Sequence, residues 1–144
     1  MRWRAWRALG ALAVGALVAL VVDVRGSGAE PVIGPGLVRV EVDIRYSLFE
    51  LDDLRVRRGT TVEFVLRNTD PIHHEFIVGD TDVHARHARG TEARHPPVPG
   101  EVSIPPHRVA STAFTFDEPG EVEYACHLPG HYRHGMRGTI TVVG

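Results

Sequence analysis

The chain has 144 residues, of which 43% are hydrophobic and 24% are charged, and its formal net charge is -2. This length predicts one domain that can bury its own core, and the single cysteine excludes an internal disulfide bond. Residues 30–144 carry 12 basic and 17 acidic side chains, and this acidic balance argues against nucleic acid as a partner.

The first 29 residues have the composition of an export signal. Three arginines precede an apolar run over residues 8–22, and the small residues Ser27 and Ala29 precede a cleavage point after Ala29. This pattern is typical of a secretory signal peptide, and cleavage is the favoured interpretation. The alternative is an uncleaved membrane anchor, although the run is shorter than the ~20 residues that span a bilayer. In both cases we expect residues 30–144 to form a monomeric domain that is exported to the periplasmic or extracellular face of the membrane.

Several short segments of the remaining chain alternate between apolar and polar side chains. Residues 37–46 alternate strictly, which indicates a half-buried strand. Further strands are expected at residues 61–68, 74–78, 110–116, 121–126 and 138–143, with a weaker edge at 49–56. Residues 79–106 hold scattered charge, Pro and Gly, and one helical turn is expected near 83–89. About seven short strands separated by Pro/Gly turns predict an all-β fold, an antiparallel β-sandwich.

The segment 124–136 carries the most specific chemistry. The only cysteine, Cys126, is followed by His131 and then by Met136 at intervals of five residues. A thiolate, an imidazole and a thioether together suit a soft transition metal, copper above all. Iron–sulfur clusters need several cysteines, and structural zinc has no use for methionine. The set therefore predicts a blue-copper site of the His₂Cys type with a weak axial Met, which needs one more histidine.

That second histidine is expected from the pair His73-His74. Alternate side chains of a strand share a face, so His74 lies in phase with the apolar Phe76 while His73 lies in phase with Glu75 and should point to solvent. By the same rule, the side chain of Cys126 leaves the inward row of its own strand. His74 and Cys126 would then meet between the sheets at one end of the sandwich.

Residues 36–143 resemble the cupredoxins, the plastocyanin and azurin family. The resemblance rests on the segment Asn68-Thr-Asp-Pro-Ile-His-His-Glu-Phe-Ile-Val-Gly79, the turn Phe116-Asp-Glu-Pro-Gly120 and the Cys-x4-His-x4-Met loop, whose spacing is similar to the auracyanin and rusticyanin type. It implies a Greek-key sandwich with one type 1 copper ion held by His74, Cys126, His131 and Met136. It also implies a Glu75 N–H that donates to the thiolate, and one-electron exchange with redox partner proteins.

The other histidines are weaker candidates for ligands. Surface or loop positions are expected for His73, His107, His127 and His134. His84, His87 and His95 form a second cluster, in which the first two would share a face of a helix. An accessory copper or zinc site is one hypothesis for this cluster, and a solvated loop is the favoured interpretation.

The sequence shows no Ser-His-Asp arrangement, paired-carboxylate motif or phosphate-binding glycine loop. A site with four protein ligands also leaves no position for a substrate, so we expect no enzymatic activity. The main hypothesis is an exported one-electron carrier. The alternatives are a copper-binding protein for storage, delivery or resistance, a copper-free interaction module, and the electron-transfer subunit of a larger oxidoreductase.

Overall fold

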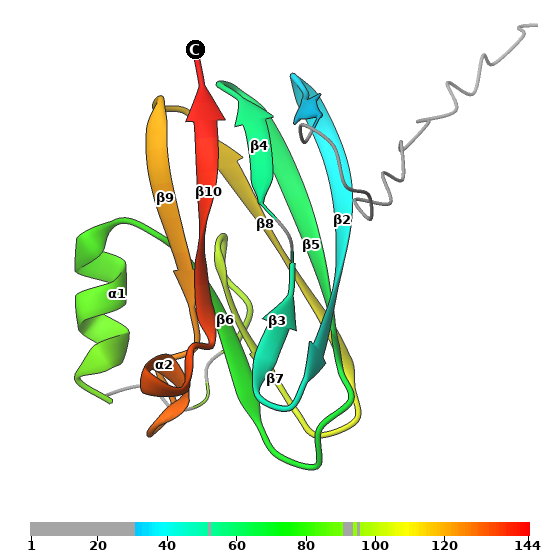
Figure 1. Cartoon of the computed structure of the whole chain (residues 1–144), viewed down its shortest axis with the longest axis vertical. Helices are drawn as coiled ribbons and strands as arrows, with labels where there is room; N and C mark the ends of the chain where they lie inside the picture. Colours follow the sequence, from blue (N-terminus) through cyan, green and yellow to red (C-terminus); the bar gives the residue numbers. More distant parts are fainter. Residues whose placement is uncertain (1–30, 52, 91–93, 95) are drawn as a thin grey trace, which may run out of the picture.

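A computed structural model of the chain describes residues 31–51, 53–90, 94 and 96–144 (Figure 1). The expected export signal, residues 1–29, and His95 lie outside the described residues. Within the described ranges no helix has the length and apolar character needed to cross a membrane.

The described residues form ten strands and two helices. In chain order these are β1 (Val32–Ile33), β2 (Gly36–Arg45), β3 (Leu48–Glu50), β4 (Leu54–Arg57), β5 (Thr60–Asn68), β6 (His74–Gly79), α1 (Thr81–Ala88), β7 (Glu101–Ile104), β8 (Val109–Phe116), β9 (Gly120–Ala125), α2 (His131–His134) and β10 (Arg137–Val143). The strands make one sheet of order β1-β4-β10-β9-β6-β7 and a second of order β3-β2-β5-β8.

The predicted all-β sandwich is confirmed, with one difference in the pairing. The prediction had only antiparallel strands, whereas β2 pairs with β5 in parallel, and β4 pairs in parallel with both β1 and β10. The remaining neighbours are antiparallel, including β6 with β9 and β9 with β10. Each sheet is therefore mixed, with both parallel and antiparallel pairs of strands.

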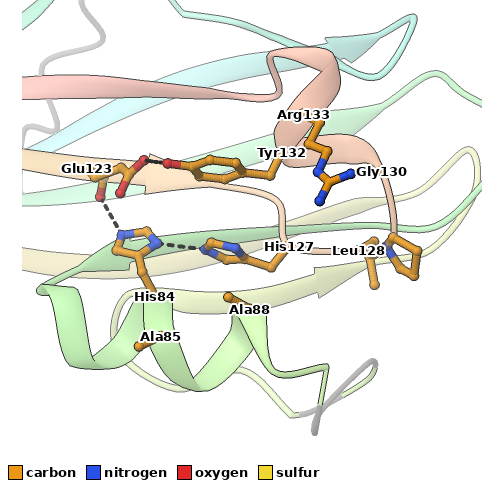
Figure 2. Close-up of a pocket in the computed structure, with 10 residues that line it drawn as sticks. His84, Ala85, Ala88, Glu123, His127, Leu128, Gly130, Tyr132 and Arg133 are labelled. Carbon is orange, nitrogen blue, oxygen red and sulfur yellow. Dashed lines mark hydrogen bonds between the residues drawn. The ribbon is translucent and has the colours of Figure 1, made fainter.

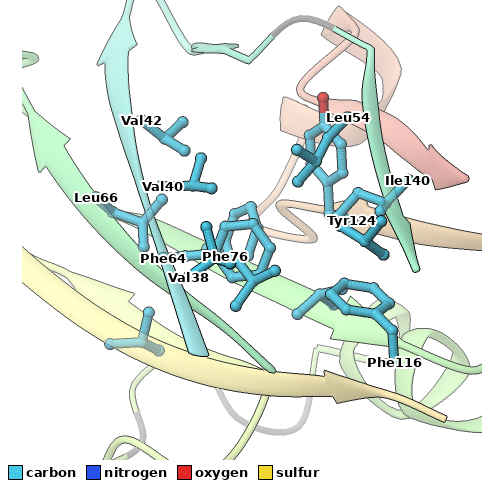
Figure 3. Close-up of a cluster of buried hydrophobic side chains, with 14 of the residues drawn as sticks. Val38, Val40, Val42, Leu54, Phe64, Leu66, Phe76, Phe116, Tyr124 and Ile140 are labelled. Atoms are coloured by element: carbon cyan, nitrogen blue, oxygen red, sulfur yellow. The ribbon is translucent and has the colours of Figure 1, made fainter. Parts of the chain in front are cut away.

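The core lies between the two sheets and follows from the alternation in the sequence (Figure 3). Every second residue of β2 from Val38 to Ile44 is buried, and β5 repeats the pattern. Aromatic rings fill the centre: the ring of Phe76 on β6 lies 4.9 Å from Phe64 and 5.6 Å from Tyr124 between centroids. This packing fixes β6 against the neighbouring sheet.

Helix α1 covers the outer face of β6, and this corrects two expectations. All six residues of β6 are buried, so Glu75 is 2% exposed instead of facing solvent. His84 and His87 lie on a regular helix capped by Asp80, and both are buried rather than in a solvated loop. The segment 79–106 also contains β7, which the sequence did not predict.

Glu101 on β7 attaches α1 to the sheet. Its carboxylate accepts a hydrogen bond from Arg86 and another, of 2.8 Å, from Nε2 of His87. Burial acts to raise the pKa of Glu101, but the hydrogen bonds from Arg86 and His87 outweigh it and hold the pKa below its usual range. A carboxyl with a lowered folded-state pKa stabilises the fold above its unfolded pKa and loses that contribution as the pH falls through the folded value.

We therefore expect Glu101→Gln to lower the free energy of unfolding at pH 7 by about 1.5–3 kcal/mol, the range for hydrogen bonds to charged groups. The difference from wild type should shrink as the pH falls below about 4.3, the ordinary Glu value. Urea unfolding at several pH values measures it, with the exposed Glu118→Gln as control. A difference that does not change with pH would contradict the assigned role.

Candidate metal centre

The predicted ligands come from neighbouring strands at one end of the same sheet. The last residue of β9, Ala125, pairs with Arg137 at the start of β10 and with Ile77 of β6, and because β9 is antiparallel to β6 the chain leaving β9 runs toward the start of β6. His74 is the first residue of β6, Cys126 directly follows β9, and Met136 directly precedes β10. His131 opens the short helix α2 in the loop between β9 and β10. The topology therefore gathers four distant sequence positions at one place.

His74, Cys126 and His131 form a triad whose ligand atoms all lie within 4.8 Å of one another. Nδ1 of His74 is 3.2 Å from Nδ1 of His131, which is in turn 3.3 Å from Sγ of Cys126. Donor atoms that share a metal at N and S bond lengths of about 2.0–2.3 Å lie about 3.2–3.8 Å apart. The two imidazoles and the thiol therefore fit a single His₂Cys metal site, the donor set that suits copper.

Asp70 orients the imidazole of His74. Nε2 of His74 lies 2.9 Å from Oδ2 of Asp70, a carboxylate oxygen that can only accept, so Nε2 carries the proton and Nδ1 presents its lone pair to the centre. The Asp70 carboxylate also accepts from the backbone N–H groups of Tyr46 and Ser47 at 2.8 Å each. These two residues form the turn between β2 and β3 with φ of 55°, so one carboxylate secures both a left-handed turn and a ligand.

Both imidazoles of the centre are shifted toward the neutral form that binds metal. Burial, the largest effect, lowers the pKa of His74, and His131 nearby lowers it further against the opposing effect of Asp70. Burial also lowers the pKa of His131, followed by the effect of His134. Neutral imidazoles keep the lone pairs that a metal ion needs, so the lowered pKa values of these two histidines favour metal binding at pH 7.

Cys126 is 0% exposed, and its thiol is protonated until a metal displaces the proton. Burial raises the pKa of this thiol to about 12, aided by the carboxylate of Glu75 and opposed by the backbone N–H groups of Glu75 and Leu128, which hydrogen-bond the sulfur. The expected N–H contact from Glu75 is therefore present. The second contact, from Leu128, was not expected, because the sequence does not show how the ligand loop folds back over its own cysteine.

Met136 is 0% exposed and belongs to the same buried cluster as Cys126. Its carbonyl accepts from the N–H of Cys126 at 3.0 Å, and its own N–H donates to the carbonyl of His131 at 3.1 Å. Gly135 precedes it with φ of 104°, a left-handed conformation that favours glycine. These contacts hold Met136 beside two members of the triad, and its role as the axial ligand stays a prediction.

The remaining candidate histidines lie outside the triad. His73 is half-buried, and the group of possible metal ligands found among the described residues does not include it. His134 is exposed, with Nε2 3.3 Å from the carbonyl of Tyr46. His107 is exposed in the loop before β8, as expected. His127 is half-buried rather than at the open surface, and its Nε2 lies 2.9 Å from Nδ1 of His84.

Asp70, which orients a metal ligand, was not predicted from the sequence. Its position four residues before His74 could have indicated a contact between the two side chains. Replacing Asp70 with alanine removes the acceptor that fixes the His74 tautomer, and such outer-shell changes typically cost 10–100-fold in metal affinity. We expect copper affinity to fall within that range in a chelator competition assay. The exposed Asp117→Ala should leave the affinity unchanged. Equal affinity in wild type and Asp70→Ala would contradict the orienting role.

Comparison with known proteins gives a consistent family assignment. The sequence model for "Copper binding proteins, plastocyanin/azurin family" matches residues 37–143. The copper-resistant cuproprotein CopI of Rubrivivax gelatinosus is 35% identical over 97 residues, covering 65% of this chain and 59% of that protein. CopI of Pseudomonas aeruginosa is 29% identical over 136 residues, covering 72% of this chain and 75% of that protein. The chain thus spans less than two thirds of the Rubrivivax relative.

Solved structures agree on the fold. Auracyanin B is 26% identical, with a TM-score of 0.60 over 78% of this chain and 92% of that one. A rusticyanin variant is 19% identical, with a TM-score of 0.59 over 83% of this chain and 85% of that one, and this likeness concerns the fold alone. The similarity to auracyanin and rusticyanin that the ligand-loop spacing predicts is therefore confirmed.

Proposed function

Because the chain belongs to the plastocyanin/azurin family of copper-binding proteins, we propose that it holds one type 1 copper ion and carries one electron at a time between redox partner proteins. The observation that carries this proposal is the triad of His74, Cys126 and His131, whose ligand atoms all lie within 4.8 Å of one another and of which His74 and Cys126 are buried. Bound copper supplies the Cu(I)/Cu(II) couple, with Met136 proposed as the weak axial ligand.

The residues around the centre favour electron transfer with little rearrangement. Asp70 fixes His74, while backbone hydrogen bonds from Glu75 and Leu128 fix the Cys126 sulfur. His74 and Cys126 are 1% and 0% exposed, so the protein excludes water from both ligands. His131 is only half-buried, and we propose its outer edge as the point where an electron leaves or enters. A site of this kind, closed by four protein ligands, supports a carrier rather than an enzyme.

The proposal places the folded domain outside the cytoplasm, on the periplasmic or extracellular face of a membrane. Its support is the export-signal pattern in residues 1–29, with retention through residues 8–22 as the alternative to cleavage. The expected partners are redox proteins, and the acidic balance of residues 30–144 favours partners with a basic docking surface. Fractionation of cells that express the full chain tests the location of the domain, and N-terminal sequencing tests whether the leader is cleaved.

A second candidate function is copper handling in resistance. It is favoured by the two curated relatives, which are both named copper-resistant cuproprotein CopI. The two functions differ in what leaves the protein, an electron or the metal ion. Cyclic voltammetry combined with transfer of Cu(I) to a chelator separates them. A reversible one-electron wave with retention of copper supports the carrier, whereas rapid donation of Cu(I) without reversible electrochemistry supports handling.

Replacing Met136 tests the axial position. A thioether favours Cu(I), whereas an amide oxygen is a harder ligand that favours Cu(II), so Met136→Gln should keep the blue colour and lower the reduction potential. Each tenfold change in the relative affinity for the two oxidation states moves the potential by about 59 mV. Voltammetry of wild type and variant measures the shift. An unchanged potential would mean that Met136 only packs beside the centre.

A further inference from the structure

Two histidines outside the metal centre face each other at the wall of a surface pocket (Figure 2). His84 comes from α1, and His127 directly follows Cys126 at the start of the ligand loop. Nδ1 of His84 lies 2.9 Å from Nε2 of His127. The pocket has a volume of about 560 Å³, and Glu123 and Tyr132 line it together with both imidazoles. The site therefore combines paired nitrogen donors with open space beside them.

The neighbouring groups determine where the protons of this pair lie. Nε2 of His84 is 3.1 Å from the carbonyl oxygen of Glu123, which can only accept, so this nitrogen carries the proton. Nδ1 of neutral His84 consequently holds a lone pair, and Nε2 of His127 donates its proton to it. When His127 changes to its other neutral tautomer, with the proton on Nδ1, two lone pairs face each other across the same gap.

The arrangement repeats the one seen at the first centre, where Nδ1 of His74 and Nδ1 of His131 face each other at 3.2 Å. In both places the two nitrogens are close enough for one cation, beside the line that joins them, to bind both at M–N distances of about 2.0 Å once the shared proton is lost. Imidazole nitrogens suit copper and zinc.

His87, which the sequence places three residues after His84, has a different role. Its Nε2 lies 2.8 Å from Oε2 of Glu101, and its Nδ1 lies 3.5 Å from Oε2 of Glu75. Carboxylates therefore face both of its nitrogens. The accessory site suggested by the spacing of His84 and His87 is replaced by a pair made of His84 and His127, which 43 residues separate in the sequence.

We infer that His84 and His127 form a second binding site for a transition-metal cation of the copper or zinc type. The pocket leaves the remaining coordination positions to water. The Glu123 carboxylate, which accepts from the hydroxyl of Tyr132 at 2.8 Å, places a negative charge at the pocket wall that favours a cation. Neither histidine belongs to the triad of the first centre, so both sites can be filled together.

A stepwise Cu(II) titration of the protein followed by EPR tests the inference. The first equivalent should fill the blue site, and the second should give a tetragonal signal with wide hyperfine splitting. His84→Gln keeps an amide that can donate to the Glu123 carbonyl, and His127→Gln removes the other donor. Both variants should retain the blue signal and lose the tetragonal one. The exposed His107→Gln is the matched control and should keep both signals.

Two outcomes would overturn the inference. Wild type could bind no second equivalent of Cu(II), or both glutamine variants could give a tetragonal signal as intense as that of wild type. Near-UV circular dichroism of each variant verifies that it is folded. A titration of Cys126→Ala with Zn(II) by calorimetry separates this inference from the proposed function. That variant lacks the thiolate but keeps the second pair, so adding His84→Gln should remove one equivalent of bound Zn²⁺, whether or not His74 and His131 also bind the ion and even if no blue site exists.

Discussion

Replacing Cys126 with alanine is expected to remove the stabilisation that copper bound at His74, Cys126 and His131 gives to this protein. A ligand that binds only the folded state stabilises it by about 2.7 kcal/mol when its concentration is 100 times the dissociation constant. In wild type, copper should therefore raise the unfolding temperature clearly. The variant loses the only thiol in the chain, and with it the strongest donor of the centre, so one equivalent of copper should raise its unfolding temperature much less than that of wild type.

Differential scanning calorimetry with and without copper measures this effect. The side chain of Cys126 is 0% exposed and protonated without metal, so alanine replaces a small neutral group and the metal-free variant should unfold close to metal-free wild type. His107→Ala, at an exposed loop position, is the control and should keep the full copper effect. Equal stabilisation of wild type and Cys126→Ala would show that copper stabilises the fold through other residues.

Phe76→Ala is expected to cause the largest loss of intrinsic stability. Its side chain is 0% exposed, and its ring contacts Phe49 at 5.3 Å, Phe64 at 4.9 Å and Tyr124 at 5.6 Å between centroids. Truncating a phenylalanine in such a position typically costs about 3–5 kcal/mol, because the cavity left behind collapses only partly. That is a large share of the roughly 5–15 kcal/mol that stabilise a typical domain.

Urea unfolding of the metal-free proteins measures this loss. The control is Val109→Ala, since Val109 is 61% exposed and surface substitutions of this kind usually stay within about 0.5 kcal/mol. Phe76 lies two residues after His74 on β6, so the variant should also bind copper more weakly. A loss of stability no greater than that of the control would mean that the aromatic cluster does not fix β6 against the neighbouring sheet.

The strands and the triad could be predicted because both depend on local patterns. Two-residue alternation located β2 and β5 to within one residue at each end, since one face of each strand is buried and the other is not. The phase of β6 also separated His74 from His73. The ligand loop was recognisable because its thiol, imidazole and thioether occur at a fixed spacing on one short connection.

What could not be predicted depends on contacts between distant segments. Glu75 is charged and in phase with a half-buried histidine, yet His87 of α1 packs against it and it is buried, and no local pattern shows that contact. The pairing of His84 with His127 joins a helix to the ligand loop and follows only from the packing of α1 against β6. Parallel pairing of β2 with β5 is likewise set by the order of strands in space.

The central claim is that His74, Cys126 and His131 hold a type 1 copper ion, and visible absorption with EPR after addition of one equivalent of Cu(II) tests it most directly. We expect a strong blue charge-transfer band from the Cys126 thiolate and narrow copper hyperfine splitting, with both absent in Cys126→Ala. If wild type with one equivalent of Cu(II) instead gives a weak band and an ordinary tetragonal signal, and the same signal appears in Cys126→Ala, the claim is contradicted, because the first copper ion would then be held by other histidines.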